Sequence, residues 1–307
     1  MAKLSIVLPV YNVSSYLDEC LESLRAQTFG DFEALCVDDG STDGSGDILR
    51  KAAERDPRIK VFSQENKGVG AARNLALDNA SGEWIGFLDA DDTIAPDWFE
   101  RMMSHAADGI DIVHAHSSYC FSGIKQYSNG SYRTFLRDGW SPLNFVRKTA
   151  IGKTRYKEGM RFKEDVVFFT ELGLKTSRIA WVNEKGYNYR MREGSAINQH
   201  IRDKDCLDFF ENMANLDLPR DDFGMTIGFD LVLWTRGRNW EKKYDPAKCK
   251  VLAFWRDGIK SGKLRYSDVR WWWRFGVWRW IETGNLAPLK KTIDLRVKAE
   301  LFVRGLK

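Results

Sequence analysis

The sequence of 307 residues predicts an α/β fold, in which helices flank a doubly wound, mostly parallel sheet. Two observations lead to this prediction. Short apolar runs of strand length alternate with helix-like patterns through the first 120 residues. A polar loop follows each of the first four of these strands. Because ligands bind beyond the carboxyl ends of the strands in open α/β sheets, these loops are expected to share one rim.

The expected strands and helices alternate strictly. Strands are expected at 4–10, 32–37, 59–62, 84–88 and 110–114, with helices at 16–26, 45–54, 69–77 and 96–107. Ser14 and Ser15 can cap the first helix, and Pro96 is placed to start the fourth. Strict alternation implies parallel strands joined by right-handed crossovers.

The composition is that of an ordinary soluble globular protein, with 43% hydrophobic and 29% charged residues. No apolar run approaches the roughly 18 residues of a membrane-spanning helix, and residues 1–9 enter a strand without a leader-like segment. The five cysteines are widely spaced, which favours free thiols and a reducing, cytoplasmic location. The four histidines show no metal-ligand spacing.

Charge divides the chain unevenly. Residues 234–307 hold 19 Lys and Arg against 7 Asp and Glu, and eight of the twelve Trp. The rest of the chain is therefore acidic, although the net charge is +4. We expect one domain over residues 1–218 and a helical, basic, Trp-rich extension over 219–307.

Each polar loop has chemistry that suits a phosphorylated ligand. Asp89-Ala-Asp91 directly follows the buried strand at 84–88, where two carboxylates are costly without a counter-charge. A divalent Mg²⁺ or Mn²⁺ ion that carries a nucleotide diphosphate would supply that charge. Asp39 could accept the imide N–H of a pyrimidine, and Arg73 could face phosphates. The loop at 38–43 alone is also good turn chemistry, and Arg73 could instead form a surface ion pair.

Two common nucleotide motifs are absent. The turn after the first strand has no G-x-G-x-x-G, which disfavours NAD and FAD, and no G-x-x-x-x-G-K-[ST] occurs anywhere. Gly68 instead suits a tight entry into the helix that carries Arg73.

Four motifs together resemble the inverting glycosyltransferases of family 2, which have the GT-A fold. The motifs are Val7-Leu-Pro9-Val-Tyr11-Asn12, Val37-Asp38-Asp39-Gly40-Ser41-Thr42-Asp43, Asn66-x-Gly68-x-x-x-Ala72-Arg73-Asn74 and Asp89-x-Asp91-Asp92. They occur in the order and spacing of that family. The resemblance is strong over residues 1–120 and weaker from there to about residue 200. It implies a nucleotide-binding half over residues 1–120 and an acceptor half over 121–218.

The resemblance implies roles for residues in these motifs. Pro9 and Tyr11 would line the base pocket, Asp39 would hold uracil, Asp91 would ligate Mn²⁺ or Mg²⁺, and Asp89 would lie near the ribose and the metal. The residues expected to bind the nucleotide sugar are Pro9, Tyr11, Asn12, Asp39, Asn66, Gly68, Arg73, Asp89, Arg190 and Ser195.

Two later segments complete the expected site. Glu164-Asp165 opens an apolar helix, where the family places its general base, so Asp165 is assigned as the base and Glu164 as its support. Alternatively, both acids only favour the helix N-terminus. Further on, Arg190, Arg192 or Ser195 could close over the diphosphate, or this segment could be a strand and a polar turn.

The basic extension has three competing interpretations. The segment from Arg270 to Ile281 is typical of a helix without one clean apolar stripe. It could pack on the catalytic domain, lie on an anionic membrane surface as a peripheral anchor, or bind an acidic polymer. No recognisable nucleic-acid module occurs, so nucleic acid is not expected as a partner.

These observations predict a metal-dependent inverting glycosyltransferase that uses a UDP-sugar and a glycan or lipid-linked saccharide acceptor. The alternative is a non-catalytic protein of the same fold that docks membranes or acidic polymers through the basic extension. The sequence does not identify the donor sugar, the acceptor, the linkage, the metal or the oligomeric state.

Overall fold

A computed structural model describes residues 2–115, 135, 139–190, 202–216 and 260 of the chain. The chain divides into two compact units, residues 1–198 and 199–307. The predicted domain boundary at 218/219 stays a prediction. Within the described residues of the second unit, helix α8 covers Asp203–Ala214.

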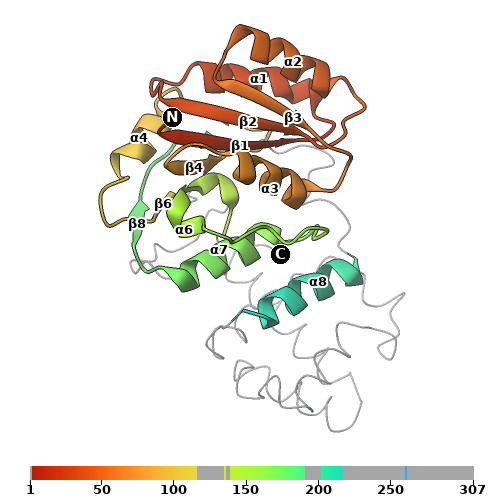
Figure 1. The fold of residues 1–307 in the computed structure, drawn as a ribbon, viewed down its shortest axis with the longest axis vertical. Coiled ribbons are helices and arrows are strands. Elements are labelled where there is room, and N and C mark those ends of the chain that lie inside the picture. The colour runs from red at the N-terminus through yellow and green to blue at the C-terminus, as the bar shows by residue number, and fades with distance from the viewer. Residues whose placement is uncertain (1, 116–134, 136–138, 191–201, 217–259, 261–307) are drawn as a thin grey trace, which may run out of the picture. The chain divides into compact units, whose positions relative to one another are not determined.

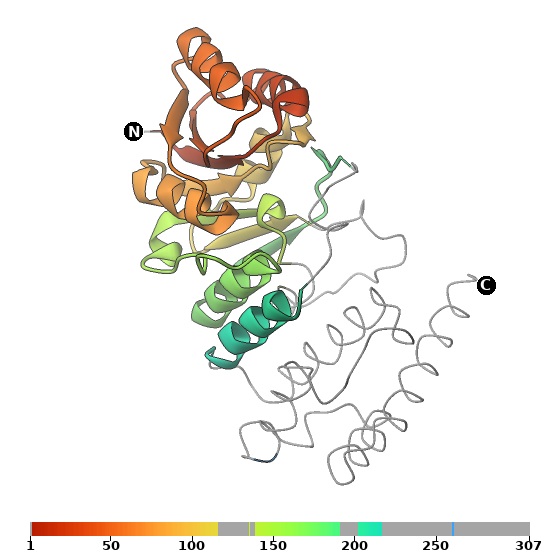
Figure 2. The ribbon, with the colours of Figure 1, turned by 90° about the vertical axis from the view of Figure 1, so that its right-hand side faces the viewer.

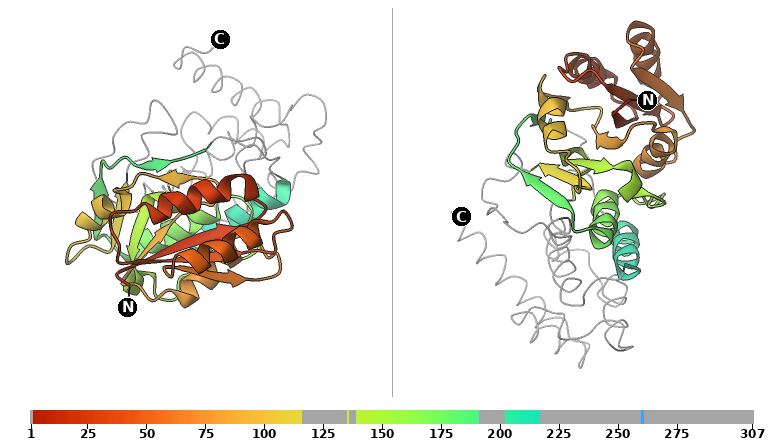
Figure 3. Two further views of the ribbon diagram at one scale, coloured as in Figure 1. Left: turned by 90° about the horizontal axis from the view of Figure 1, so that it is seen from above. Right: turned by 60° about the vertical axis from the view of Figure 1, so that its left-hand side comes forward.

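The first unit is built on a seven-stranded sheet (Figure 1). Its strands run in the order β3-β2-β1-β4-β7-β6-β8, with β3 and β8 at opposite ends (Figure 3). The strands are β1 (Leu4–Val10), β2 (Phe32–Asp38), β3 (Ile59–Ser63), β4 (Trp84–Phe87), β6 (Ile112–Ala115), β7 (Asn144–Arg147) and β8 (Ile179–Val182). The predicted mostly parallel α/β architecture is therefore confirmed.

One strand departs from the predicted series. β7 pairs antiparallel with both β4 and β6, so the expected fifth strand is not the next neighbour of the fourth. A separate two-stranded sheet pairs β5 (Thr93–Ile94) with β9 (Tyr187–Asn188). Each of these short strands pairs with a segment far away in the sequence, so no local pattern predicts them.

Helices cover both faces of the main sheet (Figures 1 and 2). One apolar core joins the sheet to α1 (Ser14–Arg25), α2 (Ser45–Arg55) and α4 (Trp98–Ser104), and the other joins it to α3 (Val69–Asn79), α6 (Lys148–Ile151) and α7 (Glu164–Lys175). The pleat of β1 decides this division. Leu4, Ile6 and Leu8 face the first core, while Val7 faces the second.

Two predicted helix starts are corrected by the structure. Ser14 is the first residue of α1 and not its cap, and Val13 is the N-cap residue. The carboxylate of Asp43, from the next loop, accepts the Ser14 backbone N–H at 2.8 Å and so satisfies that helix end. Helix α4 begins at Trp98, two residues after Pro96, and ends at Ser104.

Candidate functional site

The polar loops gather at the carboxyl ends of β1, β2, β3 and β4. The order β3-β2-β1-β4 places a topological switch point at β1, because the chain adds strands first on one side of β1 and later on the other. Open α/β sheets bind ligands in the crevice at such a point. The rim expected from the sequence therefore exists, and it is centred on the loops after β1, β2 and β4.

The loops after β1 and β2 are held to each other by hydrogen bonds. Asn12 Oδ1 accepts the Thr42 backbone N–H at 2.8 Å, and the Asn12 backbone N–H donates to Ser41 Oγ at 3.1 Å. Asn12 has a φ of 50°, which is uncommon for a residue other than glycine. Asn12 thus shapes the rim, while its predicted contact with the nucleotide stays a prediction.

Asp39 connects the second loop to the third. Its side chain is 3% exposed and accepts the backbone N–H groups of Lys67 and Gly68, each at 2.8 Å, and Gln64 Nε2 at 2.7 Å. A carboxylate can accept about four hydrogen bonds. Asp39 therefore keeps capacity for one more donor, as the uracil prediction requires.

The open side of this rim carries an aromatic ring. Tyr11 is 49% exposed and is the one exposed large hydrophobic side chain among the residues that the structure describes. Pro9, at the end of β1, is half-buried, and Asn66 is exposed in the third loop. Tyr11 follows Val10, whose carbonyl oxygen accepts the Asp39 backbone N–H, and an exposed tyrosine ring is suited to hold a planar base.

A buried arginine joins two acidic segments that are far apart in the chain. Arg73, on α3, is 5% exposed; its Nη2 contacts Asp89 Oδ1 at 3.1 Å, and its Nη1 contacts Glu164 Oε1 at 2.8 Å. The predicted metal loop and the predicted base helix thus meet through one guanidinium. In this structure Arg73 forms a buried bridge, not a surface ion pair.

Burial and charge change the acidity of this cluster. Burial raises the pKa of Asp89 despite the opposing charge of Arg73, and Asp91 adds to the rise. Burial and the neighbouring Glu164 raise the pKa of Asp165 to about 7, against the lowering influence of Arg73. A carboxyl group with a pKa near neutrality can exchange a proton at the pH of a cell.

Helix α7 starts in a constrained way. Lys163, its N-cap residue, has a φ of 56° in the left-handed region, and Glu164 and Asp165 follow in the first turn. Strained backbone of this kind costs about 1–3 kcal/mol and persists where surrounding contacts require it. The turn therefore fixes where the two carboxylates enter the rim.

Asp92 is a structural member of the acidic loop. It is 1% exposed, and its two carboxylate oxygens accept the Tyr187 hydroxyl and, at 2.8 Å, the Arg190 backbone N–H. It thereby binds β9 and the residues after it to the acidic loop.

Arg190 lies at this loop but is engaged with protein groups. Its Nε donates to the Asp91 carbonyl oxygen at 3.0 Å, its guanidinium pairs with Glu19, and it lies over the Tyr16 ring at 5.2 Å. The predicted contact of Arg190 with a diphosphate stays a prediction. Arg192 and Ser195 lie outside the described residues, as does the helix predicted at 270–281.

Tyr156, whose ring lies beside Arg73, was not predicted from the sequence. The Tyr156 ring lies 5.2 Å from Arg73 Cζ, stacks on Phe168 with centroids 4.1 Å apart, and its hydroxyl is 2.9 Å from Ser141 Oγ. The Asn74 side chain accepts the Tyr156 backbone N–H at 2.8 Å and donates to the Tyr156 carbonyl oxygen at 3.0 Å. Asn74 was visible in the third motif, but nothing in the sequence signalled Tyr156.

The donor set of the acidic loop fits a divalent ion that is shared with a phosphorylated ligand. Among the described residues, no three His, Cys, Asp or Glu side chains converge to hold a metal by themselves. Asp91 is half-exposed, and one oxygen of Asp89 is bound to Arg73. Magnesium-type sites commonly use one or two carboxylates, with substrate phosphates as the other ligands. Asp91, with Asp89 beside it, meets that description.

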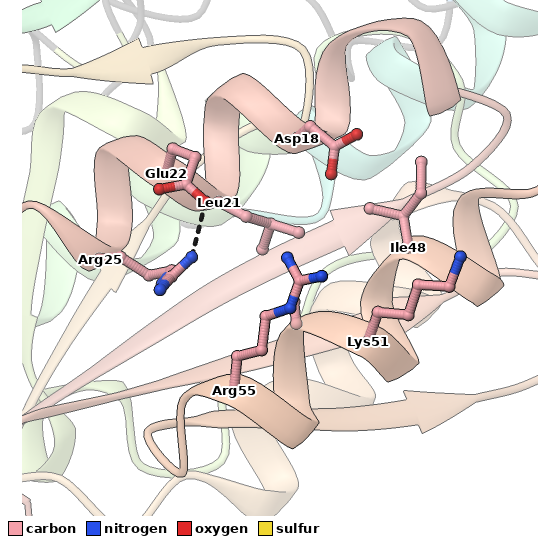
Figure 4. A pocket seen from close by; sticks show the side chains of 8 residues that line it. Asp18, Leu21, Glu22, Arg25, Ile48, Lys51 and Arg55 are labelled. Carbon is pink, nitrogen blue, oxygen red and sulfur yellow. Dashed lines mark hydrogen bonds and ion pairs between the residues drawn. The ribbon is translucent and has the colours of Figure 1, made fainter.

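A groove between α1 and α2 is separate from the rim (Figure 4). It encloses about 260 Å³, and Arg25 pairs with Glu22 along one side. Its lining residues are Asp18, Leu21, Glu22, Arg25, Ile48, Lys51, Ala52 and Arg55. They lie beyond the first three residues of each helix, whereas the rim lies where these helices begin.

The fold and the rim define an open α/β protein with an acidic site at its switch point. The sequence profile of the family described as Glycosyl transferase family 2 matches residues 5–168, more than half of the chain. The chain belongs to this family. Along its described residues, no helix is both long enough and apolar enough to span a membrane.

Individual relatives are consistent with this membership. The putative glycosyltransferase EpsH of Bacillus subtilis is 47% identical over 221 residues, which cover 64% of this chain and 63% of EpsH. Glycosyltransferase GlyA of Streptococcus pneumoniae is 33% identical over 216 residues, or 63% of this chain and 31% of GlyA. The chain thus matches less than two thirds of the length of either relative.

Solved structures share the fold. A crystal structure of Staphylococcus aureus TarS in complex with UDP-GlcNAc is 22% identical, has a TM-score of 0.76, and is matched over 99% of this chain and 92% of TarS. A mannosyltransferase from Pyrobaculum calidifontis, in complex with GDP-Man and Mn²⁺, is 16% identical, has a TM-score of 0.52, and is matched over 99% and 79%.

Proposed function

We propose that this chain is a glycosyltransferase that moves a sugar from a UDP-sugar to a hydroxyl group of a glycan or lipid-linked saccharide, with inversion at the sugar carbon. The observation that carries the proposal is the Arg73 bridge. It brings the Asp89 loop and the Glu164-Asp165 helix start together at the switch point. Membership of the family and the UDP-GlcNAc bound to TarS support the choice of donor.

The rim residues divide the work of donor binding. Tyr11 would cover the base, and Asp39 would accept its imide N–H with the oxygen capacity that three protein donors leave. Asp91, with Asp89 beside it, would hold the divalent ion, whose charge stabilises the leaving diphosphate. The Mn²⁺ in the mannosyltransferase complex is in keeping with this ion.

The base helix supplies the other half of the reaction. Asp165, whose pKa is raised to about 7, would take the proton from the acceptor hydroxyl as that oxygen attacks the sugar carbon. Glu164 holds Arg73 and thereby keeps Asp165 near the rim. One base and one displacement give inversion, since a retaining reaction needs a second step.

Donor binding tests the proposal directly. UDP affinity is measured by calorimetry with and without Mn²⁺ for the full chain, for Asp91→Ala, and for Asp108→Ala as an exposed control outside the rim. We expect Mn²⁺-dependent binding that Asp91→Ala loses and Asp108→Ala keeps. If UDP does not bind under either condition, the enzyme proposal fails and the non-catalytic alternative takes its place.

A second variant separates binding from transfer. Asp165→Asn keeps the size of the side chain but cannot accept a proton as a carboxylate does. We expect unchanged UDP affinity and at least a hundredfold slower release of UDP from a UDP-sugar, in line with the usual contribution of a general base. Transfer at more than a tenth of the wild-type rate would show that another group is the base.

A further inference from the structure

Two aromatic rings pack against each other beside the acidic loop. The centroids of Trp140 and Tyr189 are 4.9 Å apart, and the ring planes are inclined by 43°. Both residues are half-buried and pack against the first apolar core. They come from segments almost 50 residues apart in the sequence. None of the donor or base roles proposed above uses them.

The strand register places Trp140 at the rim. β7 runs antiparallel to β4, with Trp84 opposite Arg147 and Ile85 opposite Val146. Moving backward from β7 toward Trp140 therefore corresponds to moving forward along β4 toward its carboxyl end. The short helix η1 (Ser141–Leu143), which directly follows Trp140, packs against β4.

The residues on either side of Trp140 contact helix α7 and Tyr156. A Cβ atom placed on Gly139 would lie 2.9 Å from Val166 Cα, so this backbone lies against the first turn of α7. Ser141 Oγ, on the other side, is 2.9 Å from the Tyr156 hydroxyl. Trp140 is thus held next to the turn that presents Asp165.

Tyr189 reaches the same place from the acidic loop. β9 pairs with β5, with Asn188 opposite Thr93, and the next backbone N–H after Tyr189, that of Arg190, donates to Asp92 Oδ1 at 2.8 Å. One ring of the pair is therefore fixed to the proposed base helix, and the other is fixed to the proposed metal loop.

We infer that Trp140 and Tyr189 form a platform that binds a neutral pyranose ring of the acceptor. A pyranose has an apolar face of C–H groups, which suits the face of an aromatic ring, and hydroxyl groups around its edge. The first turn of α7, which carries Glu164 and Asp165, gives this place acidic neighbours, which favours a neutral sugar over an anionic one. This inference rests on the proposed function and assigns two residues to the binding of its saccharide acceptor.

The test uses the full chain and defined acceptor probes. The probes are p-nitrophenyl glycosides of glucose, galactose and N-acetylglucosamine in both anomers, with glycerol 3-phosphate as a polyol phosphate. Binding to the UDP-loaded protein is followed by saturation-transfer NMR, and transfer from UDP-GlcNAc is followed by UDP release. The variants are Trp140→Leu, Tyr189→Leu, the conservative Trp140→Phe, and Trp181→Leu as a control whose ring packs on His114.

We expect at least one glycoside to bind. Trp140→Leu and Tyr189→Leu should each weaken that binding, or raise the KM for the glycoside, about tenfold, while kcat stays within about threefold. Trp140→Phe should restore most of the loss, and Trp181→Leu should resemble the wild type. An unchanged UDP affinity in each variant shows that the rim is folded.

Two results would overturn the platform while the enzyme proposal stands. One is UDP binding by the wild type with no glycoside signal, or with use of glycerol 3-phosphate alone. The other is a glycoside affinity that neither leucine variant changes. Loss of UDP binding in the wild type is a different result, because it refutes the proposed function itself.

Discussion

The raised pKa of Asp165 predicts how kcat/KM should depend on pH. Burial and the negative charge of Glu164 together raise this pKa to about 7, against the lowering influence of Arg73. If Asp165 is the base, kcat/KM must rise with pH through about 7, since only the ionised form accepts a proton. At pH 6 about a tenth of the molecules would carry the ionised carboxylate.

Glu164→Gln should move this pH dependence in one direction only. The substitution removes the neighbouring negative charge, so the pKa of Asp165 should fall. If it falls to about 6, the ionised fraction at pH 6 rises from about a tenth to about a half, and kcat/KM at pH 6 relative to pH 8 rises about fivefold. The same change at Glu171, on α7 but paired with Lys175 and Lys157, is the matched control.

The assay is the release of UDP from UDP-GlcNAc between pH 5 and pH 9, with water or a supplied glycoside as acceptor. We expect the acid limb to move to lower pH in Glu164→Gln, to stay in place in Glu171→Gln, and to disappear in Asp165→Asn. An acid limb that keeps its position in Glu164→Gln would refute the electrostatic reasoning. A limb that persists in Asp165→Asn would refute the assignment of the base.

Two further predictions concern stability and the shape of the rim. Burial would raise the pKa of Glu33, but hydrogen bonds outweigh it and lower the pKa to about 2, among them those from Lys60 Nζ at 2.5 Å and Ser5 Oγ at 2.6 Å. The ionised Glu33 therefore stabilises the fold fully above about pH 4.5, and this stabilisation is lost as the pH falls through about 2. Glu33→Gln should therefore cost about 3 kcal/mol in urea unfolding at pH 7 and progressively less below pH 4, and an equal cost at pH 7 and pH 3 would contradict this. Gly40 has a φ of 76°, and a Cβ there would lie 2.9 Å from the Asn66 backbone N, so Gly40→Ala should cost about 1–3 kcal/mol and weaken UDP binding. Gly30→Ala, which meets nothing within 4 Å, should change neither, and equal effects of the two substitutions would show that the rim tolerates a left-handed alanine.

Local sequence patterns predicted the part of the fold in which strands close in the sequence also pair with each other. The apolar runs at β1, β2 and β4 are buried on both faces, so they stand out without any alternation. β7 was not predicted, because its four residues take their role from pairing with β4 and β6. The cap of α1 was wrong for the same reason, since Asp43 reaches Ser14 from a different loop.

The candidate site shows a similar division. The motifs pointed to Asp39, Arg73 and Asp89, and the family resemblance pointed to Asp165. The structure brings Arg73, Asp89 and Asp165 into one cluster. What each side chain contacts depends on tertiary packing. Arg190 pairs with Glu19 and donates to the Asp91 carbonyl oxygen, and the Tyr156 ring lies beside Arg73. No local sequence pattern predicts either arrangement.

The antiparallel strand β7 also has a consequence for how the chain folds. β1, β2, β3 and β4 pair within the first 87 residues through short crossovers, whereas β4 must wait for residues 146 and 147 to complete its other edge. Contacts between distant residues form more slowly, because a longer loop must close first. The rim formed by the loops after β1, β2 and β4 can therefore assemble before β7 pairs with β4. Asp165 lies beyond β7, and the residues in and after β9 that bind Asp92 come later still, so the acidic loop gains its contacts with both segments only after the first four strands have paired.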